Sequence, residues 1–238
     1  MARFKRILLK LSGESLMGKQ GYGIDPERLA DYARQIKEVQ EMGVQIGIVI
    51  GGGNIFRGLS GSQKGFDRVK GDQMGMCATV INSLALQDAI EQKGVPTRVQ
   101  TALNMVSVAE PFILRKALRH FELGRIVIFA CGTGNPYCST DTGAALRACE
   151  INADILLLAK NVDGIYDDDP KTNPDAKKID RITHMEVINR GLKAMDTTAI
   201  TMCMDNDVPV LAFALSEKDA IVRAIAGEQT GTLITNEN

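Results

Sequence analysis

The sequence predicts an α/β protein: a mainly parallel central sheet with helices on both faces, forming a three-layer αβα sandwich. Five short apolar runs, at residues 7–11, 44–50, 126–130, 155–159 and 208–213, lack strict alternation with polar residues, as strands covered on both faces do. Longer segments with helical spacing of apolar residues lie between them. Strands that alternate with helices are typical of a parallel sheet, because each parallel connection crosses over one face.

The best-marked helix precedes the second strand. Asp25 is placed to cap its first turn, Pro26 suits the first helical position and Gly43 ends it. Thr183 and Glu186 have the spacing of a capping box, which predicts another helix start. The further helices that we expect are a long one over residues 73–93, one from about residue 141 towards the fourth strand, and one over residues 216–226.

The chain is organised as one continuous unit. At about 150 residues per domain, 238 residues allow one large domain or two small ones, and neither an internal repeat nor a Pro/Ser-rich linker divides them. We therefore predict one domain over residues 1–238 and leave open two lobes, of about residues 1–150 and 151–238. Residues 161–180 are the least regular segment: Asp163-Gly164 predicts a tight hairpin turn, and two prolines interrupt the chain.

Charge and composition exclude several classes of protein. The chain has 28 Lys+Arg against 29 Asp+Glu, only 5% aromatic residues and no Trp, so it lacks the basic surplus and the stacking surface of a nucleic-acid binder. No apolar run approaches the ~18 residues of a membrane span. Five dispersed cysteines without a C-x-x-C pair indicate reduced thiols. We expect a soluble, cytoplasmic protein with no membrane or nucleic-acid partner.

The end of the first strand carries the first candidate site, Lys10-Leu-Ser-Gly. A lysine beside a small hydroxyl residue and a glycine suits phosphate oxygens, although an ordinary turn after a strand fits equally well. Residues 13–20 nearly match a P-loop, but Gln20 replaces the hydroxyl residue that would hold Mg²⁺, and a loop follows where a P-loop requires a helix. We therefore reject the P-loop interpretation.

Three glycines and an arginine, Gly51-Gly-Gly-Asn-Ile-Phe-Arg57, follow the second strand directly. Consecutive glycines cost backbone entropy and add no side chain to a core, but they let backbone N–H groups approach an anion closely. A following helix would reinforce such a site through its dipole, and the Arg57 guanidinium matches a phosphate group. The pattern favours phosphate binding over a flexible turn.

Two further segments add polar groups beyond the strand ends. Asp72 is placed either to cap the long helix or to accept hydrogen bonds from ribose hydroxyls, and both interpretations stay open. Residues 132–143 combine glycines, hydroxyls, an amide and a carboxylate, which suits a polar heterocycle or a sugar. Asp141 in this segment is placed to cap the next helix, to orient Lys10 or to help place a metal ion. The three acids at residues 167–169 are more typical of a solvated loop than of a metal site.

Phosphate-type loops and basic anchors, without a nucleophile–histidine–acid arrangement, favour phosphoryl transfer. That reaction needs positioning and charge neutralisation more than a covalent nucleophile. The sequence assigns no metal ligands.

Five segments of the chain, taken in order, form a recognisable pattern. They are Ile7-Leu-Leu-Lys-Leu-Ser-Gly-Glu, Val49-Ile-Gly-Gly-Gly-Asn-Ile-Phe-Arg-Gly, Gly71-Asp-Gln-Met-Gly-Met, Gly132-Thr-Gly-Asn-Pro and Val162-Asp-Gly-Ile-Tyr. Together they resemble bacterial uridylate kinases of the amino acid kinase superfamily over nearly the whole chain. The resemblance implies the amino acid kinase-like fold, conversion of ATP and UMP to ADP and UDP in pyrimidine nucleotide synthesis, and a requirement for Mg²⁺. It also implies a homohexamer with GTP and UTP as effectors, for which the loop at residues 18–23 is a candidate contact.

Carried over residue by residue, the resemblance implies two nucleotide sites. Residues of the ATP site would be Lys10, Leu11, Ser12, Gly13, Gly53, Arg57, Lys160, Asn161, Tyr166 and Asp169. Residues of the UMP site would be Gly52, Asp72, Thr133, Gly134, Asn135, Pro136, Tyr137, Cys138, Ser139 and Thr140. Lys10, Arg57 and Asp141 would be catalytic: Lys10 would neutralise the moving phosphoryl group, and Asp141 would orient the basic groups or the metal. The acceptor site would belong to the first lobe and the ATP site to the second.

Two alternatives stay open. A kinase of the same superfamily that phosphorylates a carboxylate or a carbamate would share most phosphate-binding segments, although Asp72 and Thr133-Gly-Asn-Pro match a nucleotide acceptor. A catalytically silent sensor of uridine nucleotides would bind the same ligands without turnover, although Lys10, Arg57 and Asp141 give no sign of lost catalysis.

Overall fold

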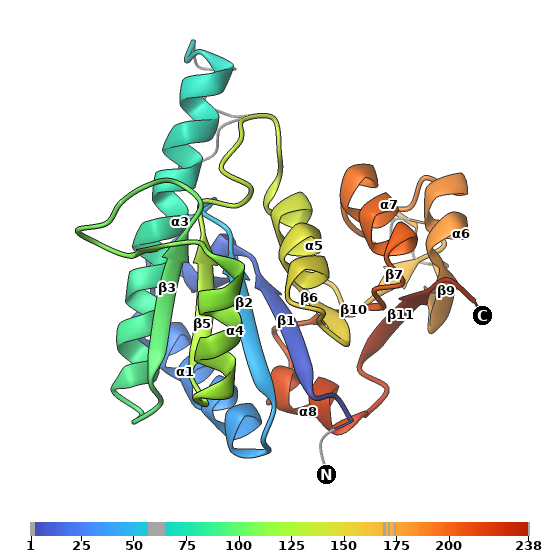
Figure 1. Cartoon of the computed structure of the whole chain (residues 1–238). Coiled ribbons are helices and arrows are strands. Elements are labelled where there is room, and N and C mark those ends of the chain that lie inside the picture. The colour runs from blue at the N-terminus through green and yellow to red at the C-terminus, as the bar shows by residue number, and fades with distance from the viewer. Residues whose placement is uncertain (1–2, 57–64, 169, 171, 174, 238) are drawn as a thin grey trace.

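A computed structural model describes residues 3–56, 65–168, 170, 172–173 and 175–237. It has the three layers that the sequence predicts, a nine-stranded sheet between two layers of helices (Figure 1). Among the described residues, no helix combines the length and the apolar character needed to cross a membrane.

The central sheet is almost entirely parallel. Its strand order is β4-β3-β5-β2-β1-β6-β10-β11-β9, and β10 with β11 is the antiparallel pair. The bounds are β1 Arg6–Leu11, β2 Gln45–Ile50, β3 Thr97–Thr101, β4 Glu110–Pro111, β5 Ile126–Ala130, β6 Ile155–Lys160, β9 Arg181–Thr183, β10 Val210–Ala214 and β11 Gly231–Thr235. The five predicted strands are confirmed as β1, β2, β5, β6 and β10, in each case with ends that differ by no more than about two residues.

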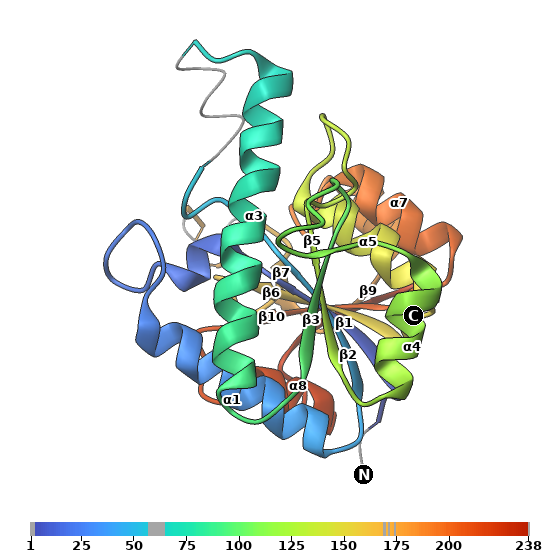
Figure 2. The same ribbon diagram turned by 60° about the vertical axis from the view of Figure 1, so that its left-hand side comes forward.

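The helices cover both faces of this sheet. Their bounds are α1 Pro26–Glu41, α3 Arg68–Glu91, α4 Leu114–Glu122, α5 Thr140–Glu150, α6 His184–Asn189, α7 Thr197–Asp205 and α8 Ala220–Ala226, with a 3₁₀ turn at Gly13–Leu16. Figure 2 shows α1 and α3 on one side of the sheet and α4, α5 and α7 on the other. Two predicted caps are confirmed: the Asp25 side chain accepts from the N–H groups of Glu27 and Arg28, and Thr183 and Glu186 form the capping box.

The alternation of side chains along β1 determines on which face of the sheet the Lys10 side chain lies. Ile7 and Leu9 belong to the core under α1 and α3, whereas Leu8 belongs to the core under α5. Side chains two residues apart in a strand share a face, so Lys10 lies on the α5 side with Leu8. The same parity places Lys160, at the end of β6, on that side with Leu158. Two lysines therefore leave neighbouring strands beneath α5.

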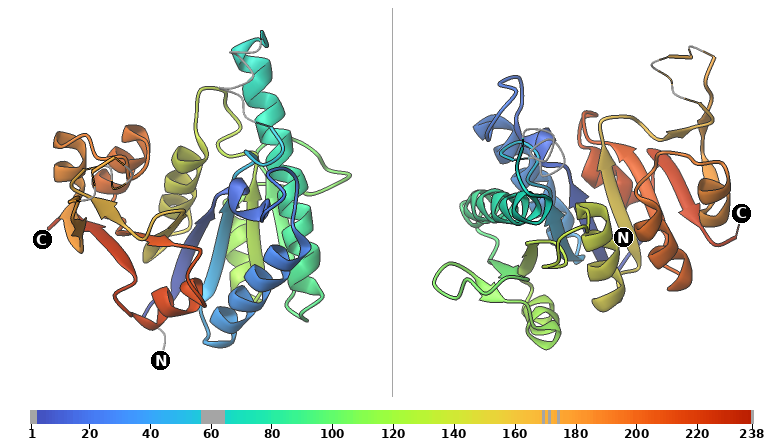
Figure 3. Two further views of the ribbon diagram at one scale, coloured as in Figure 1. Left: turned by 180° about the vertical axis from the view of Figure 1, so that it is seen from behind. Right: turned by 90° about the horizontal axis from the view of Figure 1, so that it is seen from above.

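The chain changes direction at β1. Strands β2, β3 and β5 lie on one side of β1, and the chain then crosses through α5 to β6 on its other side. Both views of Figure 3 place α3 at one end of the molecule and the elements after residue 180 at the other. Loops at the carboxyl ends of parallel strands diverge at such a switch point and leave a crevice, which is where α/β proteins bind ligands.

The predicted start of the long helix at residue 73 is wrong, the predicted helix start near residue 141 is confirmed, and neither helix is capped by its aspartate. The long helix α3 begins at Arg68 with Asp67 as its N-cap, so Asp72 lies inside the helix and does not cap it. Helix α5 begins at Thr140 and its N-cap is Ser139, whose side chain accepts from two backbone N–H groups, so Asp141 is a first-turn acid. Both aspartates are free of the capping role and keep their carboxylates for other partners.

The predicted hairpin turn at Asp163-Gly164 is also wrong. These residues connect β6 to β7 (Ile165–Tyr166), and β7 pairs with β8 (Lys178–Ile179) in a small antiparallel sheet of its own. Gly164 packs closely instead: a Cβ there would lie 2.7 Å from Oγ1 of Thr232 in β11. A tertiary contact, and not a turn, requires this glycine.

Candidate active site

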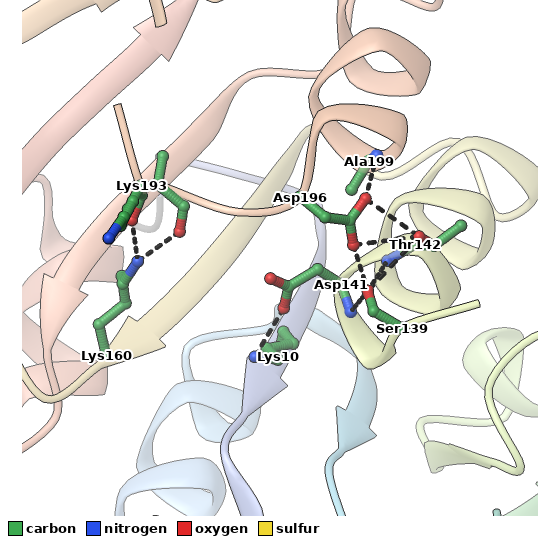
Figure 4. Close-up of polar contacts among 9 residues, drawn as sticks. Lys10, Ser139, Asp141, Thr142, Lys160, Lys193, Asp196 and Ala199 are labelled. Carbon is green, nitrogen blue, oxygen red and sulfur yellow. Dashed lines mark hydrogen bonds and ion pairs between the residues drawn. The ribbon is translucent and has the colours of Figure 1, made fainter. Parts of the chain in front are cut away.

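An ion pair lies at the switch point of the sheet. Nζ of Lys10, from the end of β1, is 2.7 Å from Oδ1 of Asp141 in the first turn of α5, and both side chains are mostly buried (Figure 4). The pair holds an ammonium group in place beneath α5 while the carboxylate compensates its charge. Oxygens of a phosphate group are the natural competitors for such an ammonium.

Asp141 is held by a chain of polar contacts that begins at Asp196. The Ser139 hydroxyl donates to Asp196 and accepts from the backbone N–H groups of Asp141 at 3.0 Å and Thr142 at 3.1 Å. Asp196 also accepts from the Thr142 hydroxyl at 3.1 Å and caps α7 through the Ala199 N–H at 2.8 Å. Figure 4 shows that these groups converge where the N-termini of α5 and α7 meet. Asp196 therefore links the two helices and fixes the turn that carries Asp141.

Lys160 lies near the same pair but is bound to the backbone. Its Nζ donates to the carbonyl of Lys193 at 2.8 Å and to that of Ala194 (Figure 4). Burial lowers the pKa of Lys160 below its usual value; the neighbouring Asp141 carboxylate opposes this shift and the Lys10 ammonium adds to it. The segment before α7 thus holds Lys160 through its carbonyls and the start of α5 through Asp196.

A cavity of about 380 Å³ opens beside Thr140, the residue before Asp141. Its walls are the loop after β2, the first half of α3 and the loop between β5 and α5. The residues predicted for the acceptor site that line it are Gly52, Asp72, Thr133, Asn135, Tyr137, Cys138, Ser139 and Thr140, together with Gly53, which was predicted on the ATP side. Phe56, Arg68, Met76 and Thr79 complete much of the lining. Gly134 and Pro136 belong to the same loop but do not line this cavity.

The loop between β5 and α5 is tied to α3 through Asp72. Oδ2 of Asp72 accepts from the backbone N–H of Tyr137 at 2.8 Å and from Nε of Arg68 at 2.8 Å. From beneath, Arg147 of α5 donates to the Gly132 carbonyl at 3.2 Å and packs on the ring of Phe112. The acceptor-side loop is therefore held by helices on both sides.

The glycine segment after β2 has a packing role that its sequence did not reveal. A Cβ on Gly13 would lie 2.4 Å from the carbonyl oxygen of Gly51, and a Cβ on Gly52 would lie 2.7 Å from that of Gly75 in α3. The described residues that follow the glycines, up to residue 56, contain a turn, and the expected support from a helix dipole stays a prediction. Close packing between backbones accounts for Gly13 and Gly52 in the structure, and anion contact remains a prediction.

Two buried asparagines fix the end of this segment. The side-chain amide of Asn82 in α3 donates to Oδ1 of Asn54 and to the carbonyl of Gly51, both at 2.7 Å. Asn54 in turn donates to the Gly23 carbonyl at 2.8 Å. The pair ties the glycine segment to α3 and to the loop at residues 18–23. Sequence reasoning missed Asn82, because its helix position is unremarkable without the partner.

A second cavity, of about 500 Å³, lies beyond β6. Its lining includes Tyr166, which was predicted for the ATP site, and two basic residues that were not, Arg190 and Lys193. Lys160 and Asn161 do not line it, although Lys160 reaches the backbone of Lys193. Lys160 therefore lies between the backbone of this cavity wall, which it contacts at Lys193, and the Lys10–Asp141 pair, whose charges it senses.

Several predicted residues lie outside both cavities or outside the described residues. Lys10, Leu11, Ser12 and Gly13 form the strand end and turn beside the glycine segment, and the Leu11 side chain is fully buried in the core. Arg57 and Asp169 fall outside the described residues. Sequence reasoning missed Arg68 and Asp196, for which the sequence holds only weak signals. Arg68 precedes Asp72 by one helical turn, and Asp196 stands before a helix as an N-cap.

The described part of the chain contains no cluster of three or more His, Cys, Asp or Glu side chains that is suited to a metal ion. Asp141 is the carboxylate at the centre of the site.

A lysine with its counter-ion lies at the carboxyl ends of parallel strands, and one cavity lies beside Thr140 and another beyond β6. This is the position at which α/β proteins bind ligands. Comparison with known proteins specifies the family. The amino acid kinase family model matches residues 5–213, and the chain belongs to this family.

Solved structures are similar over nearly the whole chain. UMP kinase from Bacillus anthracis is 38% identical, with a TM-score of 0.95 over 99% of this chain and 97% of that one. UMP kinase from Ureaplasma parvum is 37% identical, with a TM-score of 0.93 over 98% and 99%. Uridylate kinase from Archaeoglobus fulgidus is 28% identical, with a TM-score of 0.74 over 96% and 99%. The predicted fold class and the resemblance to uridylate kinases are confirmed.

Proposed function

We propose that the protein is a kinase that transfers the terminal phosphoryl group of ATP to UMP, forming ADP and UDP. A phosphate oxygen of UMP attacks the terminal phosphorus of ATP, and the bond from that phosphorus to the bridging oxygen of ADP breaks. The observation that carries the proposal is the position of the Lys10–Asp141 pair. Asp141 follows Thr140, which lines one cavity, and the pair lies near Lys160, which is bound to Lys193 in the wall of the other. The similar UMP kinase structures support the choice of substrates.

The cavity lined by Tyr166, Arg190 and Lys193 is the proposed site of the ATP nucleoside. Its basic side chains suit the phosphate end of a nucleotide, and Tyr166 offers a ring and a hydroxyl. Lys10, Ser12 and Gly13 would meet the phosphates nearer the sheet, with backbone groups of Leu11 and Gly53. Lys160, Asn161, Arg57 and Asp169 stay in this proposed set on the resemblance alone.

The cavity beside Thr140 is the proposed UMP site. Asp72 would accept from the ribose, and Thr133 and Asn135 offer hydroxyl, amide and carbonyl groups for the uracil edge. Gly52 would allow the UMP phosphate to come close to the backbone. In this proposal the elements up to α5 form the acceptor lobe and those from β6 onward form most of the ATP lobe.

Catalysis in this site would depend on positioning and on charge. Lys10 would leave Asp141 in part and bind the oxygens of the moving phosphoryl group, where its positive charge stabilises the transition state. Asp141 would keep Lys10 aimed at the gap between donor and acceptor. No covalent intermediate is needed, because both phosphates are held in line.

Mg²⁺ is the proposed metal and would be bound mainly by the phosphates of ATP. It would neutralise phosphate charge when bound. Asp141 is the side chain of this chain placed to reach it or its water ligands.

The proposed assembly is a homohexamer that responds to GTP and UTP, as the resemblance implies. Exposed apolar side chains on one face of α3, Met74 and Ile81, support contacts between subunits. The loop at residues 18–23, exposed over residues 18–22, remains the candidate effector contact. Five free cysteines spread over the chain support a cytoplasmic location.

The test is ADP release from Mg·ATP with UMP, CMP, dUMP, acetylglutamate and carbamate as parallel acceptors. Turnover confined to UMP, or strongest with it, is the expected result. Binding of UMP without turnover would favour the silent sensor, and turnover with acetylglutamate or carbamate would show that the acceptor cavity had been misassigned. A Lys10→Met variant serves as the inactive control.

A further inference from the structure

Arg68, in the first turn of α3, lines the acceptor cavity and belongs to none of the segments that indicated the site. Its Nε donates to Oδ2 of Asp72 at 2.8 Å, one helical turn further along. Its guanidinium carbon lies 5.1 Å from the ring centroid of Tyr137, which belongs to the loop between β5 and α5. Arg68 therefore contacts two different walls of the cavity.

Asp72 is where these contacts meet. Its Oδ2 also accepts from the backbone N–H of Tyr137 at 2.8 Å, so one carboxylate oxygen receives two donors. Among the residues that the structure describes, Oδ1 of Asp72 has no hydrogen-bond partner, and Asp72 lines the cavity. Two donors on Oδ2 restrict the rotation of the carboxylate and leave Oδ1 for a donor on a ligand.

Tyr137 depends on this arrangement. Its backbone has a φ of +67°, a left-handed conformation that costs an ordinary residue about 1–2 kcal/mol, and its ring is mostly exposed. Tyr137 contacts α3 through its hydrogen bond to Asp72 and through the packing of its ring against Arg68. They hold the loop against the helix in a conformation that its own backbone does not favour.

We propose that Arg68 is a positioning residue that sets the sugar specificity of the acceptor site, by holding Asp72 so that Oδ1 receives a ribose hydroxyl. The inference rests on the proposed function and adds to it the residue that orients the carboxylate. A carboxylate oxygen accepts and does not donate, so the acceptor must bring the hydroxyl, and a deoxyribose lacks one. A site built around such a hydrogen bond rejects the analogue that lacks the group, because Oδ1 of the mostly buried carboxylate is then left without a donor.

The test compares UMP, 2′-deoxy-UMP and 3′-deoxy-UMP as acceptors for the full-length protein and for Arg68→Gln and Arg68→Lys. The readout is the ratio of kcat/KM for UMP to kcat/KM for each deoxy acceptor. We expect the ratio for one of the two deoxy acceptors to fall by about tenfold in Arg68→Gln, the size of one lost charge-assisted hydrogen bond. Arg68→Lys, which keeps a positively charged donor for Asp72 where Gln offers a neutral one, should fall between that variant and the parent.

Arg119→Gln is the matched control. Arg119 forms an exposed ion pair with Glu122 on α4, at 2.9 Å, and takes no part in either cavity. Its removal should leave the ratios unchanged. Melting temperatures of all variants report on folding, and Arg68→Lys keeps the test valid if Arg68→Gln does not fold.

A second measurement asks whether Arg68 acts through Asp72. UMP binding is measured by calorimetry for Arg68→Gln, Asp72→Asn and the double variant. If Arg68 acts through Asp72, the double variant should bind UMP no more weakly than Asp72→Asn, because the carboxylate that Arg68 orients is already gone. Additive losses in this cycle, or equal losses of kcat/KM for UMP and both deoxy acceptors, would overturn the inference and leave the proposed function standing. A parent protein that does not turn over UMP would overturn the proposed function itself.

Discussion

The cavity proposed for the acceptor and the cavity proposed for the donor are built in different ways. On the acceptor side, backbone segments pack closely against each other. Gly13 lies against Gly51, and Gly52 lies against α3, at distances that leave no room for a Cβ. On the donor side, the walls come from residues 162–170 and 190–193, and Lys160 joins them to the centre through two backbone carbonyls. Close packing of backbones requires glycine at specific positions, so the first cavity is visible as a pattern in the sequence. A backbone carbonyl can come from any residue, so the second cavity leaves no such pattern.

Asp196 connects the two sides of the site. It caps α7 on the donor side and accepts from Ser139 and Thr142, which begin α5 on the acceptor side. One carboxylate therefore fixes the relative positions of two helices that carry different halves of the site. Backbone contacts hold the acceptor half together, whereas a few side chains connect it to the donor half.

The largest effect is expected at Lys10, which lines neither cavity but pairs with Asp141 at the switch point of the sheet. Lys10→Ala should lower kcat by about 10²–10³-fold, because the charge that neutralises the moving phosphoryl group is lost, with much less effect on UMP affinity. Steady-state kinetics and UMP calorimetry measure the two quantities. Near-normal turnover in this variant would contradict the role of Lys10.

The link between the two halves comes next. Asp196→Ala removes the cap of α7 and the acceptor for Ser139 and Thr142, so we expect the free energy of unfolding to fall by about 2 kcal/mol. KM values for ATP and UMP should both rise, because the turn that carries Asp141 loses its support. Urea unfolding and steady-state kinetics measure these changes. Asp196→Asn, which can still accept at the cap, serves as the milder control, and an effect on one substrate alone would show that Asp196 does not link the halves.

Close backbone packing on the acceptor side is tested at Gly52. A Cβ there would lie 2.7 Å from the Gly75 carbonyl oxygen and 2.8 Å from Cβ of Ala78, so Gly52→Ala should destabilise the protein by about 1–3 kcal/mol. Gly75→Ala is the control in the same contact: a Cβ there meets nothing within 4 Å and should stabilise α3 by about 0.5–1 kcal/mol. Denaturant unfolding compares them. Equal free energies of unfolding for the two variants would show that the backbone around Gly52 shifts to accommodate a Cβ.

The two cavities should respond separately to one substitution each. Asp72→Asn should raise the KM for UMP by about tenfold and leave that for ATP unchanged, and Lys160→Met should do the reverse. The lowered pKa of Lys160 adds a pH test. Its ammonium is lost at a lower pH than that of an ordinary lysine, so ATP binding should weaken as the pH rises, and Lys160→Met should lack this dependence. Initial rates over both substrates measure the four constants, and changes in both KM values for either variant would contradict the separation.

The smallest effect concerns His184, at the start of α6 on the donor side. The ring is buried, Nδ1 lies 2.8 Å from Oδ1 of Asn236, and burial lowers the pKa of His184 below its ordinary value of 6.5. The unfolded chain then binds the proton more readily than the folded one, so stability is present above pH 6.5 and is lost as the pH falls below it. We expect a loss of about 1 kcal/mol between pH 7 and pH 5.5 that is absent in His184→Gln. Denaturant unfolding at each pH measures it, and identical slopes for the two proteins would exclude His184 as the cause.

Sequence reasoning found the elements whose signal is local. The strands β1, β2, β5, β6 and β10 are continuous apolar runs, and the caps at Asp25 and Thr183 are short-range patterns. It missed β3, because Thr97-Arg-Val-Gln-Thr has one apolar residue. Gln100 is nevertheless fully buried there, with its amide on Glu110 at 3.2 Å, a partner that only the fold supplies. It also missed the amphipathic α4, whose exposed face is strongly charged.

The same division applies to the site. Strand-end loops rich in glycine and hydroxyl residues were found, and most of the predicted acceptor residues line one cavity. Arg68, Asn82, Arg190 and Asp196 were missed, because each acts on a partner that is distant in the sequence or is a backbone carbonyl. Asp72 and Asp141 were located correctly, but the capping role considered for each of them was wrong, since Asp67 and Ser139 begin those helices.

The sequence by itself determined the α/β class, the order of the strand-end loops and the family resemblance, because apolar periodicity, glycine spacing and capping are properties of neighbouring residues. Only the tertiary structure decided that Lys10 meets Asp141, that Asp196 joins α5 to α7, and that Gly52 is needed for packing against α3. These contacts depend on strand order and on the face to which each side chain points. The crossing from β5 through α5 to β6 brings them together, and no local pattern encodes that crossing.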